Sequence, residues 1–311
     1  MDSVKLYHVK QQFILGAYKS LVDMPLPDAS SSDYTSMLLY KARAYIALND
    51  PHSALELTAK CEENIAVRSA SALARYVAVD DDADNDAALE ELRDLAVEIE
   101  GDDSEGSSRE KALVRVLVAT ACVRAGELEE ALETLGTDTE DLEAVALLVQ
   151  VYLAINRPDL GRRQFDRSKK WAEDDLLLQL IESTIGLVTG KDGYLNSSSF
   201  YTEQLANPSL TSPHLLTARG IARIMRNEFQ EAKSDLEESL EQQNGDAETL
   251  AALCVAASLA ASRKQEAEDL WVRLSTEQPT CPLVLDVSTR SEMFDHAAAK
   301  YNVPPNIGIF G

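Results

Sequence analysis

Residue types that commonly carry chemistry are scarce in this 311-residue chain. It holds four histidines and four cysteines, and the cysteines are far apart with no Cys-x-x-Cys pair. Such spacing forms neither a zinc site nor a disulfide framework, so we expect no metal and reduced, partly buried thiols. Glycine and proline number 13 and 10, and aromatic residues make up 6%. A composition low in these types and rich in alanine favours helices over sheets.

Positive charge and long apolar runs are also in short supply. Lys and Arg number 29 against 53 Asp and Glu, a net charge of −24. Such a surface repels phosphate, so we expect no binding to nucleic acid or to anionic lipid. No apolar run approaches the about 18 residues that span a bilayer, and the N-terminus lacks a signal-peptide core. The sequence therefore predicts a soluble, cytoplasmic protein with no direct membrane insertion.

Catalytic motifs are not found in the sequence. The four histidines, His8, His52, His214 and His296, have no second ligand type at helical spacing. The segment 186–192 comes nearest to a phosphate loop, but its spacing is wrong and Asp192 stands where a Ser or Thr must bind the metal. We therefore expect no catalytic residues, no cofactor and no enzyme activity. An enzyme built on a helical scaffold would need a cluster of His, Cys or paired buried carboxylates.

One acidic stretch, Asp80–Glu91, has the carboxylate spacing of a calcium-binding loop. Acidic side chains stand at loop positions one, three, five and seven, with a Glu at twelve. Position six, a glycine in such loops, is Asn85. The alternative is an acidic turn between two helices, with Asp near the start of the second helix where the helix dipole favours it. Both interpretations place acidic insertions near 80–86 and 100–108 on the surface.

The clearest positive feature is a repeat of about 34 residues. A helix, a short turn and a second helix with a small residue near its start recur along the chain, most clearly over 38–55 and 117–132. This period is typical of tetratricopeptide repeats, in which small residues let two antiparallel helices approach closely. The small anchor residues are Ser20, Ala54, Ala88, Ala131, Gly161, Ser198, Ala232 and Ala267.

The repeat predicts an all-α fold. We expect a tetratricopeptide-like helix-turn-helix solenoid, a right-handed superhelix of about eight helical pairs plus a C-terminal helix. The solenoid should cover 1–290, a C-terminal capping helix 291–302 and a flexible tail 303–311. The alternative is an alanine-rich helical bundle in which small residues recur by chance.

A solenoid of this kind presents the first helix of each pair on its concave side, which usually binds an extended peptide or a partner element. The inward positions are all apolar, which predicts a hydrophobic, obligate partner. An adaptor that binds a charged peptide terminus would show Lys, Arg and Asn there instead. A tightly curled solenoid would bury the same residues against its own helices. The positions are Ile46, Val123, Leu153, Ile224 and Leu259.

The N-terminal run 6–18 resembles the opening of the coatomer epsilon subunit family, whose first repeat begins with an F/Y-x-x-K-x-x-F-x-x-G-x-Y pattern. The matching residues are Tyr7, Lys10, Phe13, Gly16 and Tyr18. Similar pieces follow at 39–45, 66–68 and 152–163, and the closing segment 294–301 resembles the family's terminal F-D-x-x-x-x-x-Y. The acidic stretches 80–86 and 101–108 and the tail 303–311 depart from the family pattern.

The resemblance implies a non-catalytic subunit of the COPI vesicle coat. Such a subunit binds and stabilises the C-terminal region of the alpha subunit (alpha-COP) and serves Golgi-to-endoplasmic-reticulum retrograde and intra-Golgi transport. It is peripheral to the cytoplasmic side of Golgi membranes and COPI-coated vesicles, which it reaches through other coat subunits. From the residues alone, a generic tetratricopeptide adaptor or co-chaperone scaffold that binds a peptide in its concave groove remains the alternative.

Overall fold

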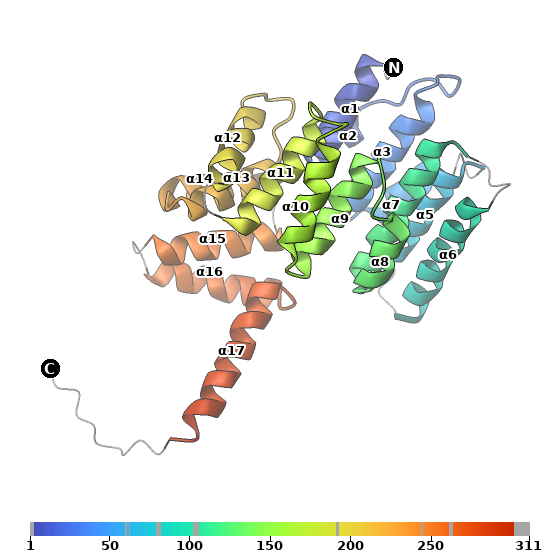
Figure 1. The fold of residues 1–311 in the computed structure, drawn as a ribbon. Helices are drawn as coiled ribbons and strands as arrows, with labels where there is room; N and C mark the ends of the chain where they lie inside the picture. Colours follow the sequence, from blue (N-terminus) through green and yellow to red (C-terminus); the bar gives the residue numbers. More distant parts are fainter. Residues whose placement is uncertain are drawn as a thin grey trace, which may run out of the picture.

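The computed structural model describes residues 3–59, 61, 63–78, 82–101, 106–190, 193–243, 245–260 and 264–301. These residues form seventeen α-helices and no strand. Sixteen of the helices follow one another as eight pairs, and the seventeenth extends from the last pair (Figure 1). The expected all-α solenoid with eight pairs and a C-terminal helix is confirmed.

The helices have the following bounds. They are α1 (Val4–Ile14), α2 (Tyr18–Asp23), α3 (Tyr34–Ala47), α4 (Pro51–Thr58), α5 (Ile65–Ala78), α6 (Asp82–Glu100), α7 (Ser108–Ala125), α8 (Leu128–Leu135), α9 (Leu142–Ala154), α10 (Pro158–Ser168), α11 (Leu176–Thr189), α12 (Gly193–Leu205), α13 (Pro213–Met225), α14 (Phe229–Gln242), α15 (Ala247–Leu259), α16 (Lys264–Glu277) and α17 (Pro282–Ala298).

Five of the first helices, α1, α3, α7, α9 and α13, end in the same turn. A residue with positive φ follows the helix, and the next N–H donates to the carbonyl five positions back, as in a Schellman motif. After α3, for example, Asn49 has a φ of 59° and the Asp50 N–H donates to the Tyr45 carbonyl at 2.9 Å. Asparagine tolerates the left-handed conformation better than most residues. The positive-φ residues are Gly16, Asn49, Gly126, Asn156 and Asn227.

This turn sets which residue of the second helix faces its partner. The buried position lies five residues after the positive-φ residue, which is why Ala54, Ala131 and Ala232 have no exposed surface. Five residues after Gly16 comes Leu21, which is 2% exposed, whereas Ser20 is exposed. The choice of Ser20 as the first anchor was therefore wrong by one residue.

The small residues differ in how much room surrounds them. A Cβ on Gly220 of α13 would lie 2.8 Å from Cγ of Leu236, whereas on Gly161 of α10 it would lie 3.6 Å from Cγ1 of Val149, an ordinary contact. We expect Gly220→Ala to lower the free energy of unfolding by about 1–3 kcal/mol through overpacking. Gly161→Ala should raise it by about 0.5–1 kcal/mol, because alanine restricts the unfolded chain. Urea denaturation of both variants would test this, and equal effects would contradict it.

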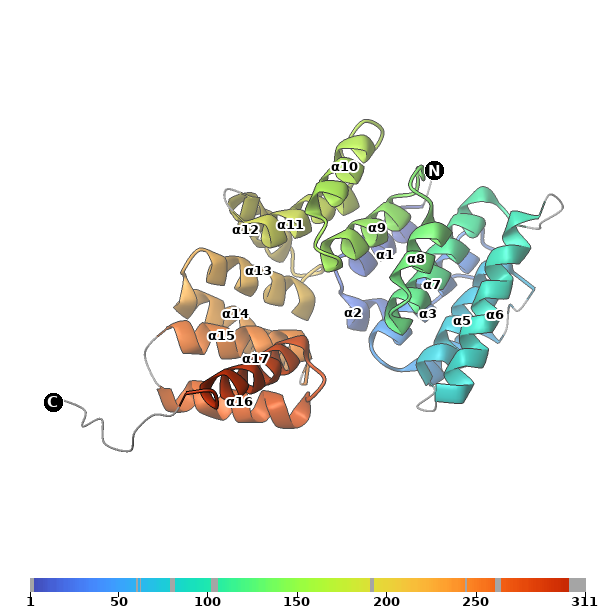
Figure 2. The same ribbon diagram turned by 60° about the horizontal axis from the view of Figure 1, so that its bottom comes forward.

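The N-terminal pair lies in the middle of the molecule rather than at one end. Helix α1 packs beside α3 and also against α11 (Figures 1 and 2). Leu15, which follows α1, shares a buried cluster with Phe200, Tyr201, Leu210 and Leu215. The Ser212 hydroxyl donates to the Leu15 carbonyl at 2.5 Å, a contact between residues 197 positions apart. The solenoid is thus curled so far that its start meets its sixth and seventh pairs.

The acidic stretch does not have the conformation of a calcium loop. Helix α6 begins at Asp82, so 82–91 is helical, and Asp80 and Asp81 lie outside the described residues. A calcium loop needs these residues to wrap around the ion, so that interpretation is wrong. The acidic residues lie in the first turns of α6, where the helix dipole favours negative charge. In the second insertion, 102–105 lies outside the described residues, and Ser107 with Glu110 forms a capping box at the start of α7.

The C-terminal helix starts earlier than expected and covers little. Helix α17 begins at Pro282, not at 291, because proline fits the first position of a helix. Val284 is its one buried residue, and the helix extends away from the last pair (Figure 1). It therefore does not cap the solenoid in the expected way. The tail expected at 303–311 lies outside the described residues.

Candidate interaction surfaces

Four of the five inward positions expected from the sequence occupy the same place in their repeats. The carbonyls of Ile46, Val123, Leu153 and Ile224 each accept the N–H of the positive-φ residue that follows, at 3.0 to 3.2 Å. Each side chain therefore lies in the last turn of its first helix. Leu259 is the last residue of α15.

The structure does not bring these five side chains together on one open face. Ile46 is 6% exposed and belongs to the largest core cluster, against which Val123 packs. Leu153 and Ile224 pack against two other clusters, those of α9–α11 and α13–α15. Leu259 is 52% exposed. The partner-binding role expected for Ile46 is thus corrected, because the helices of the neighbouring pairs bury it. For the other four, partner binding remains a prediction.

A buried ion pair that was not predicted from the sequence joins α3 to α9. Arg43 Nη2 lies 2.6 Å from Glu143 Oε2, and these side chains are 11% and 19% exposed. The Tyr40 hydroxyl donates to Glu143 Oε1 at 3.3 Å. The Arg43 guanidinium also lies 4.4 Å from the ring centre of Phe13, which ties α1 into the same contact. Three helices of the curled chain thus meet at one charged group.

The electrostatics of this cluster favour the ionised pair. Burial by itself would raise the pKa of Glu143, but the charge and hydrogen bond of Arg43 outweigh it and hold that pKa below its usual range. Burial raises the pKa of nearby Asp141, because the hydrogen bond from the Glu143 N–H and the charges of Arg43 and Lys10 only partly offset it. Lys10 lies 3.4 Å from Asp175 at the start of α11 and links α1 to that helix. These contacts therefore hold α1, α3, α9 and α11 together in the curled solenoid.

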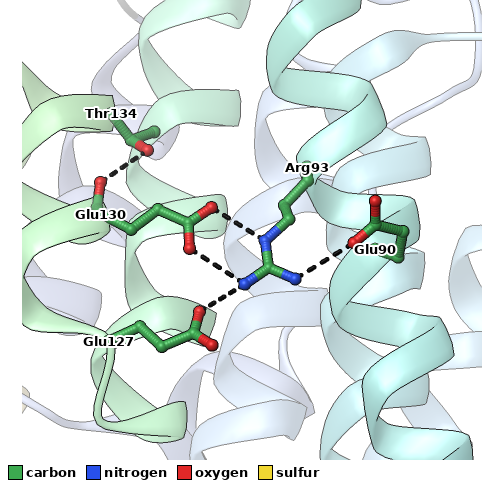
Figure 3. A network of polar contacts seen from close by, with 5 residues as sticks. All are labelled: Glu90, Arg93, Glu127, Glu130 and Thr134. Atoms are coloured by element: carbon green, nitrogen blue, oxygen red, sulfur yellow. Dashed lines mark hydrogen bonds and ion pairs between the residues drawn. The ribbon is translucent and has the colours of Figure 1, made fainter.

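One group of potential metal ligands occurs among the described residues: Cys122, Glu127 and Glu130. Figure 3 shows that the guanidinium of Arg93 already holds both carboxylates, at 2.5 Å from Glu127 Oε2 and 2.8 Å from Glu130 Oε1. Burial, with the two carboxylates, raises the pKa of the Cys122 thiol to about 11, so the thiolate that a metal needs is disfavoured. These residues form an ion-pair network.

That network connects two neighbouring second helices. Arg93 belongs to α6, Glu127 caps the start of α8 and Glu130 lies in its first turn. Glu90, one turn before Arg93, lies 3.1 Å from the same guanidinium (Figure 3). Exposed ion pairs add little one at a time, but one arginine shared among three carboxylates fixes the spacing of α6 and α8.

Exposed apolar side chains gather at the C-terminal end of the chain. Fourteen large apolar side chains are exposed among the described residues, and half of them follow residue 258. Phe294 and Tyr301 are 72% and 75% exposed. Clustered apolar exposure marks interaction surfaces more often than scattered exposure does. We use the name C-terminal apolar surface for these residues, which are grouped by their position in the sequence and lie on more than one side of α17: Leu259, Val272, Leu285, Val287, Met293, Phe294 and Tyr301.

The model of the coatomer epsilon subunit family matches residues 2–302. The chain belongs to this family. It is 27% identical over 256 residues to a probable coatomer subunit epsilon of Schizosaccharomyces pombe, which covers 82% of this chain and 80% of that protein. It is 25% identical over 301 residues to the coatomer subunit epsilon of Caenorhabditis elegans, covering 95% and 98% of the two chains. The resemblance expected from the sequence is confirmed.

Solved structures show the same fold. A tetratricopeptide repeat protein from Parabacteroides merdae superposes with a TM-score of 0.53 at 15% identity, covering 81% of this chain and 96% of that one. The Cut9–Hcn1 assembly gives a TM-score of 0.51 at 13% identity, covering 88% and 58%. In the described part of the chain, no helix combines the length and apolar character needed to cross a bilayer. Membership of the coatomer epsilon family indicates a structural role in a vesicle coat.

Proposed function

We propose that this member of the coatomer epsilon family binds the C-terminal region of the alpha subunit and stabilises it within the coat. In that role it serves retrograde Golgi-to-endoplasmic-reticulum and intra-Golgi transport, held at Golgi membranes and COPI-coated vesicles through other coat subunits. Family membership supports the assembly, and the C-terminal apolar surface supports a permanent partner. Interfaces of permanent complexes are large and apolar, unlike those that recognise a charged peptide end.

The observation that carries this proposal is the exposure of Leu259. It is the inward position that remains accessible at 52%, and the other exposed apolar residues of α16 and α17 follow it in the chain. An apolar side chain in the centre of an interface can contribute much of the binding free energy. The exposure of Leu259 supports its choice as the side chain to change first.

Co-purification with the alpha subunit's C-terminal region from the same organism tests the proposal. We expect the full-length wild-type chain to recover the alpha fragment and Leu259→Asp to weaken the complex at least about tenfold, a loss of about 1.4 kcal/mol. Val97→Asp on α6 is the matched control, because Val97 is 70% exposed and lies outside the C-terminal apolar surface. Native circular dichroism should be retained by both variants.

Two results would contradict the proposal in different ways. Wild-type chain that recovers no alpha fragment would reject the partner. If Leu259→Asp recovers as much alpha fragment as the wild type, the proposed partner would stand but its interface would lie elsewhere on the solenoid.

A further inference from the structure

A groove of about 740 Å³ lies along α10 and is separate from the C-terminal apolar surface. Its walls are α10 with the turn that follows it, and the segment between α8 and α9 that contains Thr137 and Asp138. Tyr152 and Leu160 contribute apolar surface to the lining. Figure 2 shows α10 at the edge of the molecule, away from α15–α17.

The groove is cationic in a protein that is otherwise strongly anionic. Residues 157–170 contain six of the chain's 29 Lys and Arg residues and two of its 53 Asp and Glu residues. Four of the six line the groove: Arg162, Arg163, Arg167 and Lys170. The whole chain has a net charge of −24 and repels acidic ligands, so a local positive field determines where an acidic ligand can approach.

Three acidic side chains, those of Asp138, Asp159 and Asp166, also line the groove, and each is paired with an arginine. Arg157 Nη2 lies 2.8 Å from Asp159 Oδ2, and Arg162 Nε lies 3.3 Å from Asp166 Oδ1. Arg167 pairs with Asp138 and also donates to the Thr137 carbonyl at 3.0 Å.

Three exposed cations remain beyond these pairs. Arg163, Lys169 and Lys170 have no carboxylate partner within the described part of the chain. Two of them, Arg163 and Lys170, face the groove as lining residues. Their charges are therefore available to a ligand.

We propose that this groove binds an acidic, extended segment of a partner protein. Arg163 and Lys170 are seven residues apart, which corresponds to about 10 Å along a helix. Carboxylates three residues apart in a peptide in the extended polyproline II conformation lie on the same side and are about 9 Å apart. Such a peptide can pair with both cations and lay its backbone over Tyr152 and Leu160. The contact is electrostatic, and therefore sensitive to salt, unlike the interface of the proposed alpha complex.

Fluorescence anisotropy of a rhodamine-labelled peptide of four Asp-Ser-Gly units tests the proposal on the full-length chain. We expect saturable binding that weakens with salt, and no binding of the matching Asn-Ser-Gly peptide. Arg163→Glu combined with Lys170→Glu should raise the dissociation constant at least about tenfold. Arg124→Glu combined with Lys300→Glu, both exposed and distant in sequence, makes the same change in net charge and should alter it by less than about twofold.

Four outcomes would overturn the proposal. The first is a wild-type chain that shows no saturable binding of the acidic peptide, and the second is an equal loss in both charge-reversal pairs. The third is binding to vesicles that contain phosphatidylinositol phosphate without binding to the peptide, which would assign the groove to a lipid headgroup. The fourth is self-association that the Arg163 and Lys170 changes abolish, which would make a second copy the occupant. Circular dichroism should be native in both variants.

Discussion

Glu143→Gln should lower the free energy of unfolding by about 3–5 kcal/mol. The substitution keeps the shape of the side chain but leaves Arg43 charged, buried and without its carboxylate, 4.4 Å from the ring centre of Phe13. Because the pair joins α3 to α9, protection from hydrogen exchange should fall in α1, α3 and α9 more than in α13–α16. Urea denaturation and hydrogen exchange measure the two effects.

A double variant distinguishes two causes of lost stability: the loss of the ion-pair interaction and the presence of an unpaired buried charge. Arg43→Met combined with Glu143→Leu removes both charges and keeps the volume, so its stability should lie within about 1.5 kcal/mol of the wild type or above it. A double variant as unstable as Glu143→Gln would show that loss of the ion pair itself, and not the unpaired Arg43, lowers the free energy of unfolding.

The same variant also isolates the pH dependence of Glu143. The pKa of Glu143 is lowered in the folded state, so its contribution is fully present above the unfolded value of about 4.3 and is lost as the pH falls through the folded value. The stability gap between wild type and Glu143→Gln should therefore be full at neutral pH and close in acid. The comparison cancels the opposite contribution of Asp141, whose pKa burial raises.

Asp235→Ala should cost a similar amount, about 3–5 kcal/mol, within a single helical pair. Asp235 is 3% exposed and accepts from Arg219 at 2.7 and 2.9 Å and from Arg223 at 2.6 Å, which joins α14 to α13. Removing the carboxylate leaves two guanidinium groups facing each other with little access to water. Guanidinium chloride would screen the charges under test, so urea denaturation is the suitable measurement.

Asp286→Ala is the control for this prediction. Arg290 Nε lies 2.7 Å from Asp286 Oδ2 on α17. This is also an arginine–aspartate ion pair, but both of its side chains are exposed. Exposed pairs along one helix contribute little, so the urea midpoint should stay at the wild-type value. Equal losses from the two Asp changes would reject the argument from burial.

The sequence predicts what depends on neighbouring residues and fails for what depends on distant ones. The turn residues Asn49, Asn156 and Asn227 and the small residues five positions later specify each helical pair locally, so the number of pairs was predicted correctly. Arg43 and Glu143 are 100 residues apart, and only the curvature of the solenoid brings them together. The burial of Ile46 comes instead from the neighbouring pairs, whose packing onto the end of α3 the repeat pattern did not specify.

Some features could have been found from the sequence and were not. The run Arg162, Arg163, Arg167, Lys169 and Lys170 is a visible concentration of basic residues in an acidic chain. The arginine between Ala42 and Ala44, one turn after Tyr40, is a charged residue on a helix whose other residues are mostly apolar, which signals a buried partner. The spacing of Asp80–Glu91 was misleading, because carboxylates at alternate positions are equally compatible with the first turns of a helix.

The position of α1 has a consequence for synthesis of the chain. In most solenoids each repeat contacts its neighbours and can fold as soon as it is made. Here Leu15 finds its apolar neighbours and the Ser212 hydroxyl about 200 residues later. At about 5–20 residues per second, the ribosome needs roughly 10–40 s to deliver them. For that time α1 and α2 can pack on α3 but Leu15 remains uncovered, so we expect a nascent chain interrupted before α13 to expose an apolar site at Leu15.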